Sequence, residues 1–140
     1  MYDLQDLIDH IKTECPTYTV GWIKETDQNL PNQTDAVSVL VGYHSVDADG
    51  VLGDGSTPDP FVQFSEDLIL YAIVQFNCKS SDFPVVWRAL YHACSKWIPM
   101  PAEADYTAFT HSGGGVKGIQ SGRMSWVDRW RISFPRASQF

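Results

Sequence analysis

Two segments of the sequence combine residue types that can hold an ion, and the first of them is acidic. Ser45-Val-Asp-Ala-Asp-Gly50 is similar to the start of a calcium-binding loop, where side-chain oxygens alternate along the chain and a glycine forms the turn. The twelfth position, counted from Ser45, is Ser56, where such a loop needs a bidentate Glu. No helical pattern flanks the segment. We therefore expect a solvated acidic turn within a loop at residues 45–63, and we predict no metal site.

The second segment, Ser112-Gly-Gly-Gly-Val-Lys-Gly118, is rich in glycine. Consecutive glycine amides can point at an anion that a lysine such as Lys117 neutralises. The spacing of a phosphate-binding loop is absent, because no Gly-Lys is followed by Ser or Thr. We instead expect a flexible hairpin tip that orders against a partner, with Lys117 as a contact residue.

Histidines and cysteines are the remaining candidates for metal binding or nucleophilic catalysis. No histidine pair has the close spacing with a neighbouring Glu that zinc hydrolases use, and an odd number of cysteines does not indicate a disulfide framework. A small enzyme would need a tertiary Cys/His contact, or a pocket lined by His92, Cys94 or the aspartates. We predict no catalytic residue and no cofactor. The residues considered are His10, His44, His92, His111, Cys15, Cys78 and Cys94.

Asp128 lies between Trp126 and Trp130 in an alternating run, on the face that a strand would bury. A lone buried carboxylate is unfavourable, so Asp128 should have a basic partner. We predict a structural ion pair between Asp128 and Arg88, with Arg123 on the same hairpin as the alternative. A register-fixing pair is favoured over a catalytic acid.

The composition is that of a folded domain, and we expect one domain spanning residues 1–140. Hydrophobic residues make up 44% of the chain and charged residues 19%, close to globular averages. The longest apolar stretch, Leu68 to Phe76, is about half of the ~20 residues that a membrane-spanning helix needs. The N-terminal Met1-Tyr2-Asp3-Leu4 lacks the basic region of a signal peptide. Neither membrane insertion nor export by this route is indicated.

Charge is distributed unevenly along the chain. Residues 1–67 hold 13 of the 17 acids and only two bases, whereas the rest of the chain holds eight of the 10 bases. Such asymmetry favours association in which one copy's acidic surface meets its neighbour's basic surface. The net charge of -7 argues against general nucleic-acid binding. The predicted interface residues are Asp3, Asp6, Lys117, Arg123, Arg129, Arg131 and Arg136.

Hydrophobic periodicity predicts an α+β fold. Leu4, Leu7, Ile8 and Ile11 follow helical spacing, which predicts a helix over residues 3–14. A second helix begins at Ser81 or Asp82 and ends before Pro99. Alternating patterns predict strands at residues 18–22, 36–44, 65–78 and 126–134, and a hairpin at 106–120 with its tip at 112–115. With no regular βαβ alternation, an antiparallel or mixed β-sheet packed with two main α-helices fits best.

The element order, the size and the C-terminal run Trp126-Val-Asp-Arg-Trp-Arg-Ile-Ser-Phe-Pro-Arg136 resemble the tail-terminator, or tail-completion, proteins of long-tailed bacteriophages. The resemblance covers most of the chain but includes no sharp motif. It implies a virion protein, assembled in the host cytoplasm, that forms a hexameric ring on the finished tail tube. Such a ring stops polymerisation of the tail tube protein, meets the head-tail connector protein and lets DNA pass through its lumen without specific binding.

Two alternatives stay open at this point. One is another neck component, a head-tail joining protein, which would bind the head connector instead of the tail tube. The other is a small metal-binding enzyme.

Overall fold

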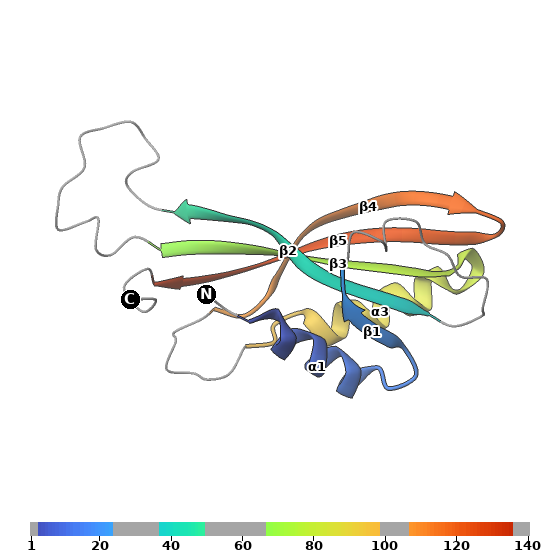
Figure 1. The fold of residues 1–140 in the computed structure, drawn as a ribbon, viewed down its shortest axis with the longest axis horizontal. Helices are drawn as coiled ribbons and strands as arrows, with labels where there is room; N and C mark the ends of the chain where they lie inside the picture. Colours follow the sequence, from blue (N-terminus) through green and yellow to red (C-terminus); the bar gives the residue numbers. More distant parts are fainter. Residues whose placement is uncertain (1–2, 24–36, 50–66, 99–106, 136–140) are drawn as a thin grey trace.

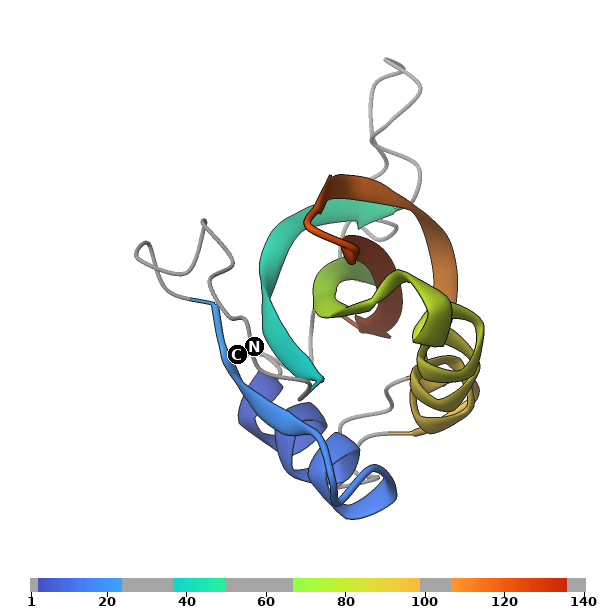
Figure 2. The same cartoon turned by 90° about the vertical axis from the view of Figure 1, so that its right-hand side faces the viewer.

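The fold is a twisted five-stranded sheet with two helices on one face (Figures 1 and 2). The computed structural model describes residues 3–23, 37–49, 67–98 and 107–135. The elements in chain order are α1 (Leu4–Glu14), β1 (Thr19–Trp22), β2 (Ser38–Asp49), β3 (Asp67–Lys79), the short 3-10 helix η3 (Ser80–Asp82), α3 (Phe83–Cys94), β4 (Thr110–Gln120) and β5 (Arg123–Pro135).

The strand order is β1-β2-β3-β5-β4. β1 pairs with β2 in parallel, whereas β2–β3, β3–β5 and β4–β5 are antiparallel, so the sheet is mixed. This confirms the predicted α+β class with two helices. β1 and β4 form opposite edges of the sheet.

The core lies between the helices and the inner face of the sheet. Helix α1 buries its predicted apolar stripe, and β3 and β5 bury alternate residues, as their patterns predict. Asp3 caps α1, because its side chain accepts a hydrogen bond from the Gln5 amide at 2.9 Å. The largest fully buried side chains are Trp130, Phe76, Phe109, Phe134, Leu4 and Leu7.

The predicted hairpin at residues 106–120 is wrong. The glycines do not form its tip but lie inside strand β4, and the turn is at Ser121 and Gly122. Both turn residues have positive φ, 53° and 77°, which matches the right-handed twist of the flanking strands in a two-residue hairpin loop. The Ser-Gly pair is therefore the true turn signal.

Two other predicted boundaries also move. β2 continues to Asp49, five residues beyond the predicted end at His44, and so includes part of the acidic segment. The rest of the predicted loop lies outside the described residues. Helix α3 ends at Cys94, because Lys96 donates its amide to the Phe109 carbonyl (3.0 Å) and Trp97 accepts from the Phe109 amide (2.9 Å). Because these hydrogen bonds pair Lys96 and Trp97 with Phe109, the chain cannot continue as a helix beyond Cys94.

Candidate subunit interface

Basic side chains gather on the outer face of the sheet, which points away from the helices. Alternation along β3 and β5 turns these side chains outward, while Trp130 and Ile132 point into the core. Arg129 and Arg131 are exposed there, as predicted. Arg136 lies outside the described residues. The basic face consists of Lys79, Lys117, Arg123, Arg129 and Arg131.

Two members of the basic face are held by amides of the central strand β3. Lys117 Nζ donates to Gln75 Oε1 at 3.2 Å, and Arg123 Nε donates to Asn77 Oδ1 at 2.7 Å. The sequence placed Lys117 on a flexible hairpin tip, and this prediction is wrong, because Lys117 lies within strand β4. It is the bulged residue between two paired positions of β4, where the register with β5 shifts.

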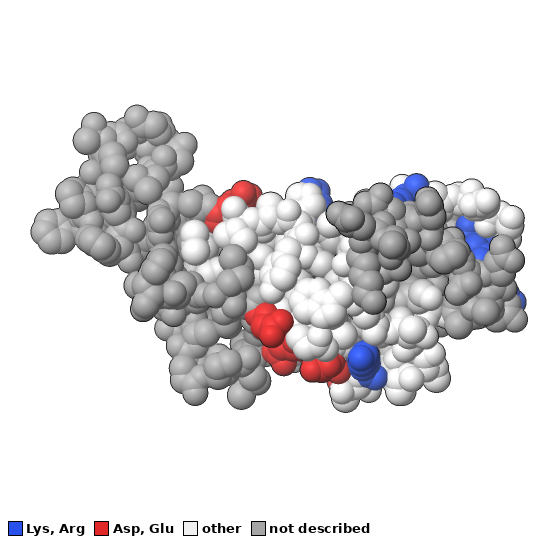
Figure 3. All heavy atoms as spheres, viewed as in Figure 1, with Lys and Arg blue, Asp and Glu red and all other residues white. Residues whose placement is uncertain are grey.

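Acidic side chains lie at the other edge of the molecule, on α1. Figure 3 shows them gathered over this helix, and basic side chains near the end where β4 turns into β5. Helix α1 packs against β1 and β2, the strands at the end of the sheet order opposite β4, and also against α3. Asp9 and Glu14 are exposed and Asp6 is partly exposed, while Asp3 serves as the helix cap.

Strand β4 is an exposed edge, with Val116 and Ile119 exposed to 52% and 64%. Its two register shifts and its lysine are features that keep edge strands from pairing with other chains. Contacts made by this edge are therefore expected to use side chains more than backbone pairing.

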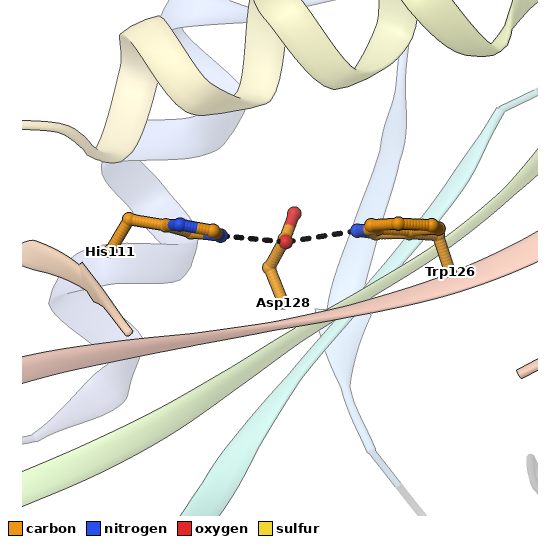
Figure 4. Close-up of polar contacts among 3 residues, drawn as sticks. All are labelled: His111, Trp126 and Asp128. Atoms are coloured by element: carbon orange, nitrogen blue, oxygen red, sulfur yellow. Dashed lines mark hydrogen bonds and ion pairs between the residues drawn. The ribbon is translucent and has the colours of Figure 1, made fainter. Parts of the chain in front are cut away.

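A second polar group lies under α3, on the inner face of the sheet (Figure 4). His111 Nε2 donates to Asp128 Oδ1 at 2.8 Å, and Trp126 Nε1 donates to the same oxygen at 2.9 Å. Asp128 is buried, as predicted, but its predicted partner is wrong. Arg88 is exposed on α3, and the alternative Arg123 contacts Asn77 instead.

Aromatic rings pack around His111, whose side chain stays 24% exposed. The ring of His111 lies 5.0 Å from Trp130, 5.6 Å from Tyr91 and 6.2 Å from Trp87, centroid to centroid. Gly114 makes room for the group, because a Cβ at this position would overlap Asp128 Oδ1. The arrangement fastens β4 to β5 beneath the helix, which is a structural role.

The cysteines do not complete a nucleophilic site with His111. Burial raises the pKa of the Cys94 thiol well above its ordinary value, and the charge of Asp128 raises it further. Burial also raises the pKa of Cys15 and of Cys78. A raised pKa lowers the fraction of reactive thiolate, the opposite of what a catalytic cysteine needs.

The same burial predicts slow thiol chemistry in the folded protein. At pH 8, a disulfide reagent should modify Cys94 at least about a hundredfold more slowly in the native protein than in guanidinium. The reagent can reach this buried thiol only when the protein unfolds locally. All three thiols should react at once after unfolding. Mass spectrometry of digested samples would identify the modified residues, and fast native labelling of Cys94 would contradict its burial.

No protein-family model and no curated protein matches this chain. Within the described residues, no cluster of three or more His, Cys, Asp or Glu side chains could hold a metal ion. In the same part of the chain, no helix is long and apolar enough to cross a membrane.

Several residues of both sites were not identified from the sequence. Gln75 and Asn77 looked like ordinary strand residues, and no local signal marks them as partners of Lys117 and Arg123. His111 was predicted at the end of one hairpin arm, and no hydrogen-bond partner was predicted for it. The Ser-Gly turn could have indicated that β4 runs beside Asp128, but the two register shifts hide which residue meets it.

Proposed function

We propose that this protein is a virion assembly protein of the tail-terminator type. Copies join head to tail into a ring, expected to be hexameric, that caps the phage tail tube and ends its polymerisation. The ring then presents a surface to the head-tail connector, and DNA passes through its lumen without specific binding. Assembly of this kind needs no catalytic group.

The observation that supports the proposal is the placement of opposite charges at opposite edges of one sheet. A ring requires a heterologous contact, in which one patch meets a different patch on the next copy. The acidic helix α1 lies at the β1 edge and the basic face lies toward the β4 edge. One copy can therefore offer an acid to one neighbour and a base to the other.

The proposal is tested by native mass measurement over a range of protein concentrations, followed by negative-stain imaging and a tube-growth assay. We expect a ring of six copies, and tubes that stop growing when the protein is added to polymerising tail tube protein. Unchanged tube growth would contradict the proposal. Binding to the head connector protein without binding to the tube would instead indicate a head-tail joining protein.

A further inference from the structure

The two helices form a layer on the sheet, and its outward surface carries opposite charges on its two sides. Helix α1 exposes Asp9 and Glu14, whereas α3, which contains no acid, exposes Arg88, and Lys96 is exposed two residues beyond the end of α3. Asp9 accepts a hydrogen bond from Gln5 of its own helix at 3.0 Å. Within the described part of the chain, the side chains of Glu14, Arg88 and Lys96 have no hydrogen bond and no ion pair. These charges are therefore available to a partner.

The two helices meet along a seam that is aromatic and only partly buried. The ring of His10 stacks on that of Trp97, with centroids 4.2 Å apart and an angle of 7° between the planes. His10 Nε2 also donates to the Ala93 carbonyl oxygen at 2.7 Å. Both rings stay partly exposed. An aromatic centre between charged sides is typical of protein interfaces, where tryptophan is enriched at the centre and polar groups lie at the rim.

Lys96 has a backbone conformation that favours glycine. Its φ is 63°, at the position just after the cap of α3, where helices commonly end with glycine. The Lys96 amide donates to the Phe109 carbonyl oxygen at 3.0 Å, a hydrogen bond that glycine could make equally well. The chain therefore keeps a lysine at a conformational cost, although the side chain has no partner in the described part of its own chain. This favours a role for the cation between chains.

Helices α1 and α3 run in opposite directions, and the contact of His10 with the last turn of α3 sets their relative position (Figure 1). Asp9 is adjacent to His10, so it lies level with the end of α3 and with Lys96. Glu14 lies about 6 Å further along α1 than His10. Arg88 lies about 7.5 Å back along α3 from the residue that His10 contacts. Each of the two acids therefore has a base at its own level.

A two-fold axis parallel to the helices, placed over the seam, turns this surface onto itself. The rotation leaves each residue at its level along the helices but exchanges the two sides of the layer. Helix α1 of one copy then faces α3 of the other, and the same contact forms twice. Such a contact is isologous, because the same surface is used by both copies.

We infer that the helical layer joins two copies of this chain around such an axis. Asp9 of each copy pairs with Lys96 of the other. Glu14 pairs with Arg88 in the same way. The inference goes beyond the proposed function, because the ring contact joins two different patches whereas this contact joins one surface to itself. It doubles whatever the other surfaces form, so that a single copy becomes a pair and a ring becomes two rings face to face.

Charge reversal tests this contact by analytical ultracentrifugation at low salt. At the same concentration, the natural protein should have twice the mass of the variant R88E/K96E. The variants R88E/K96E and D9K/E14K should each pair at least about a hundredfold more weakly than the natural protein, because like charges then meet in every contact. Both helices are acidic in the first variant and basic in the second. An equal mixture should therefore regain pairing to within about tenfold.

R129E/R131E is the matched control for net charge. It changes the net charge by the same amount as R88E/K96E, at exposed positions on the outer face of the sheet. It should pair through its helices as tightly as the natural protein, to within about threefold. These two arginines belong to the basic face that the proposed ring uses, so a variant that loses rings but keeps pairs would separate the two contacts. Far-ultraviolet circular dichroism checks that every variant is folded.

Lys96→Gly removes one cation without straining the fold. Glycine adopts the positive φ freely, so the variant should be at least as stable as the natural protein in urea denaturation. It should nevertheless pair about tenfold more weakly. Unchanged pairing would contradict the role of the lysine between copies.

The inference is overturned if R88E/K96E keeps the mass of the natural protein, if the folded mixture stays unpaired, or if the natural protein forms no species of twice the variant's mass at any concentration. The tube-growth assay on the natural protein reports the proposed function separately. Capping without pairing would overturn only the inference, whereas pairing without capping would overturn only the terminator function.

Discussion

Replacing Gly114 with alanine should destabilise the protein by about 3 kcal/mol, since the new Cβ needs space that the buried polar group occupies. The Cβ would overlap Asp128 Oδ1 and lie 2.9 Å from both Trp126 Nε1 and the Val127 carbonyl oxygen. One of these neighbours is backbone in a paired strand and cannot move away freely. The expected loss in melting temperature is roughly 10 °C.

Gly115→Ala is the matched control, because it makes the same chemical change one residue along the same strand. Nothing lies within 4 Å of a Cβ at Gly115. Its unfolding free energy should change by less than about 0.5 kcal/mol. Urea denaturation of both variants measures the difference, and equal stability of the two would contradict the close packing of Gly114 against Asp128.

Asp128→Ala should also cost about 3 kcal/mol of unfolding free energy. The change removes the oxygen that accepts from both His111 and Trp126, and so leaves two donors in a largely buried site without that acceptor. The expected loss comes from these donors more than from the lost charge.

Asp128→Asn separates the two contributions. Asparagine keeps the side-chain size and one acceptor oxygen but carries no charge, so we expect a loss of only about 1 kcal/mol. The chemical shift of the Trp126 indole proton should stay near its natural value in D128N and move in D128A. If the two variants prove equally stable, the shared oxygen is not what fastens β4 to β5.

Elements with local signals were predictable from the sequence. Helix α1 was predicted with its buried apolar stripe, because that stripe depends on residues within one or two helical turns. The alternating pattern of β5 correctly predicted that Trp130 points into the core and that Arg129 points outward. For the same reason, part of the basic face was already identified as a set of candidate interface residues.

Elements without a decisive local signal could not be predicted from the sequence. The glycines of β4 were interpreted as a flexible tip because glycine is common in turns. In the structure, Gly114 is required by contact with a side chain from another strand, which no pattern within residues 112–118 reveals. Likewise, the end of α3 is set by backbone bonds to Phe109, fifteen residues beyond Cys94.

By itself, the sequence determined the fold class, the amphipathic helix, the burial of Asp128 and the separation of acidic from basic residues along the chain. Only the tertiary structure decided that His111 is the partner of Asp128 and that Gln75 and Asn77 hold Lys117 and Arg123. The physical reason is register. Ser112 and Lys117 are bulged, each shifts the pairing of β4 with β5 by one residue, and such shifts depend on contacts between strands instead of on local propensity.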